Sequence, residues 1–143
     1  EKMFNEASRH SSKTRFLWVR YGNVLGTTGS VIPKWRQGIK EAKPIYLTDK
    51  RMTRFFLTLD EAVDTIFEAL IKSKNVIPKM KAMYIWDLAK IMAGSKVKII
   101  VGKIRPGEKL HETLIADYEG EEYTSKKALK YTKNEIGKLL KKI

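Results

Sequence analysis

The chain has 143 residues, a length that fits one domain around a single core, and no stretch approaches the roughly 18 apolar residues of a membrane span. It contains no cysteine, which excludes disulfide bonds and thiolate metal sites and is the pattern expected of a cytoplasmic protein. Residues 1–75 carry 14 basic and 8 acidic groups, and residues 76–143 carry 15 and 8. The net charge of +13 is therefore spread evenly, which indicates a lysine-rich solvated surface rather than a nucleic-acid-binding patch.

The first predicted elements alternate between helix and strand. Residues 1–10 have the pattern of the end of a helix. Phe16–Val19 is a continuous apolar run, typical of a strand buried on both faces of a parallel sheet. Glycines at both ends and in the middle of residues 22–29 then predict a loop, and Ser30 is a suitable cap for a helix over 31–40.

Two strand candidates, residues 44–47 and 55–57, precede the clearest helix of the chain. Thr58 and Glu61 have the spacing of a capping box, which predicts a helix over 59–71. Apolar residues follow at helical spacing and form one stripe, made of Leu59, Ala62, Val63, Ile66, Phe67, Leu70 and Ile71.

The second half of the chain continues the alternation. A helix is predicted over 84–92 and a strand over 97–101. Another capping box, Thr132 with Glu135, opens a last helix that is expected to bury Ile136, Leu139, Leu140 and Ile143. Strands that alternate with helices predict the α/β class.

Three segments contain residue types that packing alone does not require. The first is Val19–Gly26, a predicted strand that runs into the glycine loop. Ligands of open α/β sheets lie beyond the carboxyl ends of strands, so Asn23 and nearby backbone amides are placed to meet a cofactor or phosphate. Taken alone, the same pattern is typical of an ordinary turn.

The second segment is Met52–Thr58, in which Arg54 stands beside two phenylalanines and before the capped helix. A guanidinium group is the preferred protein ligand for phosphate oxygens. The alternative is a surface arginine that lies over the aromatic side chains.

The third segment is Ile104–Glu112. Arg105 is predicted to end a strand, Pro106-Gly107 to form a turn and Glu108 to open a helix. Such a turn places a cation for phosphate beside a carboxylate for a sugar diol, although an exposed salt bridge explains it equally well. His111 is expected on a helix surface or in packing, because two histidines in the chain give no metal-ligand spacing.

Taken together and in this order, the segments resemble extended short-chain dehydrogenases that act on nucleoside-diphosphate sugars. The resemblance is greater to the capsular-polysaccharide branch, the inverting UDP-N-acetylglucosamine 4,6-dehydratases. It covers nearly the whole chain and fades after about Asp117. The matching motifs are Arg20–Gly26, Gly29–Pro33, Met52–Phe56, Val76–Met80 and Arg105–Glu112.

The resemblance also implies roles for individual residues. The implied substrate-binding set is Asn23, Val31, Ile32, Pro33, Tyr46, Leu47, Arg54, Arg105 and Glu108. In this set Arg54 and Arg105 grip the two phosphates of a UDP-sugar, and Glu108 binds the ribose hydroxyls. The implied cofactor-binding set, along the nicotinamide end of NADP or NAD, is Tyr21, Val24, Leu25, Gly26, Thr27 and Thr28.

The chain departs from this family in what it lacks. No glycine-rich dinucleotide fingerprint occurs, and the catalytic lysine of the family is expected upstream of Glu1. We therefore expect residues 1–29 to be a remnant of a Rossmann domain and residues 30–143 to bind the nucleotide-sugar. No catalytic or metal-binding residue is expected here, and the chain alone is expected to bind no cofactor and to be inactive.

For a complete protein the resemblance implies oxidation at sugar C4, loss of water across C5 and C6, hydride return to C6 and inversion at C5. The missing half or further copies of the chain are the expected partners. Three alternatives stay open: a UDP-sugar epimerase or reductase of the same scaffold, a nucleic-acid-binding module, and a remnant without a ligand. The expected burial of Trp18, Phe55, Phe56 and Phe67 disfavours the nucleic-acid module, whose aromatic residues are exposed.

Overall fold

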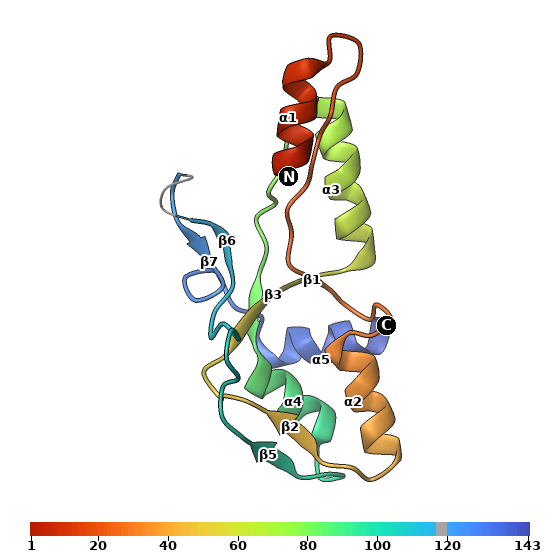
Figure 1. The fold of residues 1–143 in the computed structure, drawn as a ribbon. Helices are drawn as coiled ribbons and strands as arrows, with labels where there is room; N and C mark the ends of the chain where they lie inside the picture. The colour runs from red at the N-terminus through yellow and green to blue at the C-terminus, as the bar shows by residue number, and fades with distance from the viewer. Residues whose placement is uncertain (117–119) are drawn as a thin grey trace.

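The computed structural model describes residues 1–116 and 120–143, so Asp117, where the resemblance fades, lies outside the described residues. Helices and strands are mixed along the chain, which confirms the α/β class (Figure 1). In chain order the elements are α1 Lys2–His10, β1 Asn23–Val24, α2 Val31–Lys40, β2 Ile45–Leu47, β3 Thr53–Leu57, α3 Leu59–Lys72, β4 Ala82–Tyr84, α4 Ile85–Ala93, β5 Ile99–Val101, β6 Thr113–Ile115, β7 Tyr123–Thr124 and α5 Lys133–Lys142.

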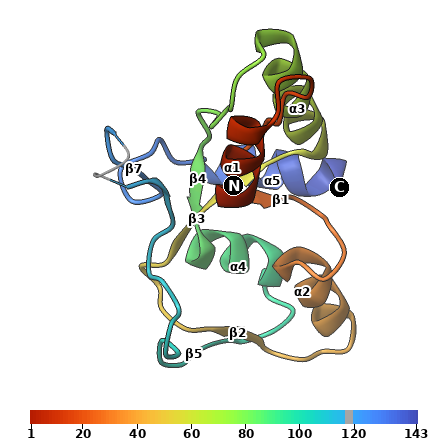
Figure 2. The same ribbon diagram turned by 45° about the horizontal axis from the view of Figure 1, so that its top comes forward.

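Strand β3 lies at the centre of the molecule. It pairs with β1 in parallel and with β4 in antiparallel orientation, while β2 pairs with β5 and β6 pairs with β7. Helices α1 and α3 extend to one side of this central sheet, and α2, α4 and α5 gather with β2 and β5 on the other (Figures 1 and 2). The central sheet, made of β1, β3 and β4, thus lies between these two groups of elements.

The hydrophobic core consists of two clusters that meet at β3. Phe56 belongs to the cluster that includes Ile32 and Leu88, whereas Phe55 and Leu57 belong to the other. Successive side chains of a strand point to opposite faces, so this short strand contributes to both clusters. Arg54 is therefore part of the strand that both clusters share.

Both predicted capping boxes are confirmed. Thr58 accepts a hydrogen bond from the Glu61 backbone and Glu61 bonds back to Thr58, and Thr132 and Glu135 repeat the arrangement at α5. Ser30 stands at the N-cap of α2 as predicted, but its side chain makes no capping bond.

The prediction of a fully buried strand at Phe16–Val19 is wrong. These residues are half-buried and extended, and Val19 forms a single parallel bridge with Val76. Arg20 N donates to Val76 O at 3.0 Å, and Val76 N donates to Trp18 O at 3.2 Å. Across the described ranges this segment pairs only with residues 75–76, which is too little for a ladder.

The apolar stripe of α3 is the second correction. The helix buries its small residues Ala62, Thr65 and Ala69, while Phe67 is 57% exposed and Ile71 is 82% exposed. The expected core position of Phe67 is therefore wrong. In α5, Ile136 is buried as predicted, but Ile143 at its end is exposed.

The helix expected to begin at Glu108 is absent from the described chain. Residues 105–107 form a turn, and the chain then continues without regular structure to β6. Gly107 has a φ of 80°, which favours glycine and stops the segment from entering a helix there.

Candidate functional site

A cavity of about 270 Å³, the central cavity, lies where β1, β2, β3 and the 105–108 turn meet. Arg54 and Arg105, far apart in the sequence, both line it, so the predicted convergence of these two arginines is confirmed. Its lining residues are Asn23, Val31, Trp35, Tyr46, Leu47, Thr48, Met52, Arg54, Phe56, Ile85, Arg105 and Glu108.

The central cavity gathers seven of the nine predicted substrate-binding residues. The other two, Ile32 and Pro33, do not line it: Ile32 is 1% exposed and packs in the core, and Pro33 is half-buried. Five lining residues were not predicted as site residues: Trp35, Thr48, Met52, Phe56 and Ile85. Four of them are large and apolar, and such residues usually indicate core packing.

Close contact between β1 and β3 places Asn23 at the cavity. Asn23 pairs with Phe56 across the parallel strands. A Cβ atom on Gly22 would lie 2.4 Å from the Phe55 Cβ, so only glycine permits this approach. The side-chain nitrogen of Asn23 donates to Phe55 O at 3.0 Å and to Glu112 Oε1 at 2.9 Å. Its side-chain oxygen is then the atom left to meet a ligand.

Arg54 is largely occupied by its own chain. One terminal nitrogen donates to Thr53 O at 2.8 Å and to Leu110 O at 3.2 Å, and the other donates to Lys109 O at 2.6 Å. Its Nε lies 3.7 Å from Glu112 Oε1. Arg54 therefore acts as a clamp on residues 109–112, and it retains little donor capacity for a bound phosphate.

Arg105 and Glu108 sit on a small closed turn at the mouth of the cavity. Glu108 N donates to Arg105 O at 3.0 Å, and the Glu108 carboxylate accepts from Arg105 N at 3.2 Å. Within residues 1–116 and 120–143, the Arg105 guanidinium has no hydrogen bond or ion pair. It is thus the cation of this cavity that remains available for an anion.

Behind the cavity lies a polar network that the sequence did not reveal. Thr53 Oγ1 is 2.7 Å from His111 Nδ1 and 2.7 Å from Ser125 Oγ, and both Thr53 and Ser125 are fully buried. Burial lowers the pKa of the His111 imidazole, and nearby cations lower it further. A neutral imidazole fits this network, which confirms a packing role for His111.

The predicted cofactor residues form a separate group outside the central cavity. Leu25 is 4% exposed and belongs to the core, while Tyr21 and Val24 pack against the second cluster. Residues 26–28 are exposed, and Thr27 Oγ1 donates back to Val24 O at 3.0 Å. The exposed edge of this loop is short.

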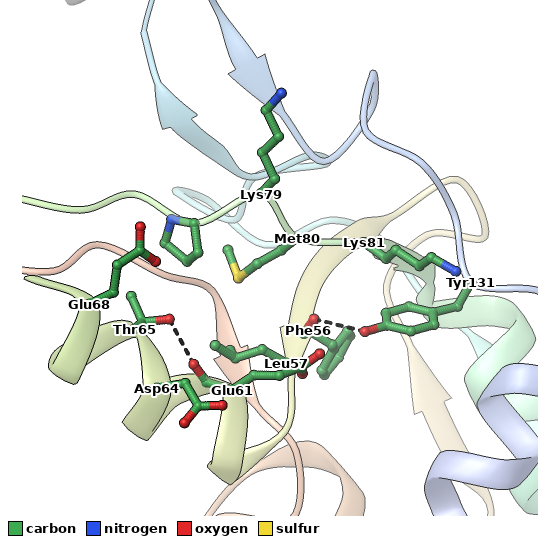
Figure 3. Close-up of a pocket in the computed structure, with 11 residues that line it drawn as sticks. Phe56, Leu57, Glu61, Asp64, Thr65, Glu68, Lys79, Met80, Lys81 and Tyr131 are labelled. Atoms are coloured by element: carbon green, nitrogen blue, oxygen red, sulfur yellow. Dashed lines mark hydrogen bonds between the residues drawn. The ribbon is translucent and has the colours of Figure 1, made fainter.

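A larger cavity of about 520 Å³ lies between α3 and residues 78–81 (Figure 3). Its charged groups are mostly paired within the chain. Glu61 completes the capping box, Glu68 pairs with Lys72, and Lys81 pairs with Glu135. The cavity contains none of the predicted site residues, so the smaller central cavity is the better candidate.

Neither a metal site nor a membrane span is found among the described residues. They contain no cluster of histidine, cysteine and carboxylate side chains able to hold a metal ion. No helix among them has the length and apolar character needed to cross a membrane.

Comparison with known proteins identifies relatives of this chain. A family profile described as "Polysaccharide biosynthesis protein" matches residues 1–134. The inverting UDP-N-acetylglucosamine 4,6-dehydratase of Campylobacter jejuni serotype O:2 is 41% identical over 135 residues, covering 86% of this chain and 40% of that protein. UDP-glucose 4-epimerase of Rickettsia bellii is 39% identical over 113 residues, covering 75% of this chain and 33% of that protein. The chain therefore spans less than half the length of these relatives.

Solved structures show the same fold. The crystal structure of Pen from Bacillus thuringiensis superposes with a TM-score of 0.87 and 30% identity, over 99% of this chain and 53% of that one. A dTDP-glucose 4,6-dehydratase from Streptomyces venezuelae and two 4-epimerases, at 13–18% identity, share the fold alone, and the dehydratase was solved with NAD bound. The α/β fold is that of a Rossmann-type short-chain dehydrogenase, of which the chain represents about half.

Proposed function

Because the chain belongs to the family of polysaccharide biosynthesis proteins, we propose that its central cavity binds the nucleoside-diphosphate part of a UDP-sugar. The observation that carries the proposal is the convergence of Asn23, Arg105 and Glu108 on one cavity from three separate segments. The Arg105 guanidinium, which has no partner among the described residues, suits a phosphate, and the nearby Glu108 carboxylate suits a pair of hydroxyls.

Each wall of the cavity has a different part in this proposal. Tyr46 and Leu47 of β2 and Trp35 of α2 provide apolar surface for the uracil and ribose. Arg105 meets the diphosphate, with the Asn23 oxygen oriented toward the sugar side. Arg54 supports the site by holding the chain that carries Arg105, so the diphosphate depends less on Arg54 than the family resemblance implies.

We further propose that the parent protein is an NADP-dependent UDP-N-acetylglucosamine-type 4,6-dehydratase of the cytoplasm. Residues 1–29 would belong to its Rossmann domain and residues 30–143 to its substrate-binding region. This chain would bind and orient the UDP-sugar, and the acid and base groups would come from outside it. The similarity to the Campylobacter dehydratase supports this reading.

The exposed loop at residues 26–28 fits one edge of a nicotinamide cofactor, whereas Leu25 is too deeply buried to touch one. The cofactor, when bound, supplies hydride acceptance and return at the sugar. The described part of the chain offers no glycine-rich cradle for its pyrophosphate, so we propose that this chain borders the cofactor without holding it.

Calorimetric titration with UDP tests the nucleotide site. We expect Arg105→Ala to weaken UDP binding by about 1.5–3 kcal/mol, the range for hydrogen bonds to a charged group. Arg105→Lys should restore only part, because lysine lacks the planar fork. Arg51→Ala is the matched control, since Arg51 is exposed, pairs with Asp49 and does not line the cavity. UDP affinity that Arg105→Ala leaves unchanged would contradict the assignment.

A UDP-sugar 4-epimerase is the second candidate, and the 39% identical Rickettsia relative supports it. Both activities require the same nucleotide cavity, so UDP binding does not separate them. Product analysis does: a protein of the relatives' full length, given UDP-N-acetylglucosamine, releases a 4-keto-6-deoxy sugar if it is a dehydratase. An epimerase returns the 4-epimer without loss of water.

A further inference from the structure

The carboxylate of Glu112 lies behind the central cavity and contacts two of the residues that line it. Its Oε1 accepts from Asn23 Nδ2 at 2.9 Å, and its Oε2 accepts from Phe55 N at 2.7 Å. Arg54 Nε lies 3.7 Å from Oε1. Bonds to an ionised carboxylate are stronger than neutral ones, so this single group joins β1, β3 and the segment that follows the Arg105 turn.

Residues 109–112 are fastened to the start of β3 along their backbone as well. Thr53 N donates to Leu110 O at 3.0 Å. Glu112 N donates to Ser125 Oγ at 2.8 Å, and Ser125 N donates to Glu112 O at 2.8 Å. Together with the Arg54 clamp, these bonds begin only four residues after Arg105.

On the other side of Arg105 the chain is held at β5, whose last residue Val101 pairs with Leu47 of β2. Residues 102–107 are all exposed. Gly102 N donates to Leu47 O at 2.7 Å, and the turn at Arg105 and Glu108 is closed only upon itself. The Arg105 turn therefore lies between two anchors, β5 before it and residues 109–112 after it, and Glu112 is the charged centre of the second.

We infer that Glu112 is a positioning residue of the nucleotide site: it turns the Asn23 oxygen toward the sugar hydroxyls and anchors one end of the turn from which Arg105 faces the diphosphate. The inference rests on the proposed function, because it assigns Glu112 a part in UDP binding. A purely structural glutamate would stabilise the fold without being coupled to Arg105. Coupling between the two residues is therefore the property to measure.

A double-mutant cycle in UDP affinity measures this coupling. Glu112→Gln keeps the size of the side chain but replaces one acceptor oxygen by a donor, which then faces either the Asn23 amide or the Phe55 N–H. We expect UDP affinity to fall about tenfold, as for loss of a charged hydrogen bond, and uridine affinity to fall less. In the Arg105→Ala background the same change should cost about twofold or less.

Glu122→Gln is the matched control, because Glu122 is exposed and pairs only with Lys127 across the described residues. It should leave UDP affinity unchanged. Hydrogen–deuterium exchange supplies a readout without ligand: amides of residues 102–112 should exchange faster in Glu112→Gln than in the control. If Glu112→Gln does not fold, Glu112→Asp, which keeps the charge, goes through the same cycle.

Equal losses in both backgrounds, or an exchange rate at residues 102–112 that does not change, would overturn the positioning role. A wild-type chain that binds no UDP refutes the proposed function instead. The exchange measurement still decides in that case whether Glu112 orders the Arg105 turn.

Discussion

Gly22 offers the sharpest test of how the site is built. A Cβ atom at this position would lie 2.4 Å from the Phe55 Cβ and 2.8 Å from the Phe55 carbonyl oxygen. Carbon atoms in good contact are about 3.5–4.0 Å apart, so Gly22→Ala requires the two segments to separate by about 1 Å. Phe55 cannot move easily, because it is fully buried and its N–H is bonded to Glu112.

Overpacking of this kind costs about 1–3 kcal/mol, and we expect the upper end because the clash is partly with backbone. Urea denaturation followed by circular dichroism measures the free energy of unfolding. Gly137→Ala is the matched control: nothing lies within 4 Å of a Cβ there, and the position is inside α5. It should gain about 0.5–1 kcal/mol from helix propensity. A loss below about 1 kcal/mol for Gly22→Ala, within the usual range of tolerated changes, would refute the close-approach argument.

Three further predictions concern a buried tyrosine, the cofactor and an exposed helix face. Burial raises the pKa of Tyr131 to about 12, so the stability linked to its neutral phenol is present below about pH 10, the ordinary pKa of tyrosine, and is lost as the pH rises through about 12. Tyr131→Phe should flatten that alkaline loss in denaturation curves, and an unchanged pH profile would contradict it. Because the sequence has no glycine-rich fingerprint for the pyrophosphate, NADP titrated against the chain should show no submicromolar affinity by fluorescence. Submicromolar affinity would contradict this prediction. The exposed face of α3, with Phe67 and Leu70 each 57% exposed, should cause association that light scattering detects on a dilution series. Serine at both positions should reduce it, and a compact wild-type monomer at every concentration would contradict it.

Local chemistry explains which helices could be predicted from the sequence. A capping box involves residues three apart, so Thr58 and Thr132 locate the starts of α3 and α5 without any knowledge of the fold. The buried face of α3 could not be predicted in the same way. Its large apolar residues form a stripe, yet the described chain packs against Ala62 and Ala69 instead. Which face is covered depends on partners that periodicity does not specify.

The same distinction applies to the nucleic-acid alternative. Phe55 and Phe56 are buried as predicted, but the expected burial of Phe67 is wrong. Burial of the aromatic residues therefore disfavours a nucleic-acid-binding module less than the sequence predicts. The charge of the helix that carries Phe67 disfavours such a module instead. Helix α3 carries four acidic residues and one basic residue, and an acidic helix repels a polyanion.

Most of the predicted substrate-binding residues line the central cavity, but the hydrogen bonds that hold them could not be predicted from the sequence. Asn23, Tyr46, Leu47 and Arg54 lie in strands β1, β2 and β3, which bring them to one cavity, and short strands at or near these positions are indicated by the sequence. Glu112 was missed as a functional residue because its bonds to Asn23 and Phe55 span 89 and 57 positions. In the sequence its only signal is its place in the motif Arg105–Glu112, in which the resemblance implies roles for Arg105 and Glu108 alone.

The distribution of charge separates general attraction from specific binding in this molecule. The net charge of +13 attracts any polyanion over long range, and salt screens such attraction. At the central cavity positive and negative groups offset one another. Arg54 donates to backbone carbonyls and lies beside Glu112, and Glu108 stands next to Arg105. Discrimination between a diphosphate and another anion therefore depends on the placement of one guanidinium relative to Asn23. Placement of that kind is a property of the anchored turn, and the abundance of lysine on the surface cannot substitute for it.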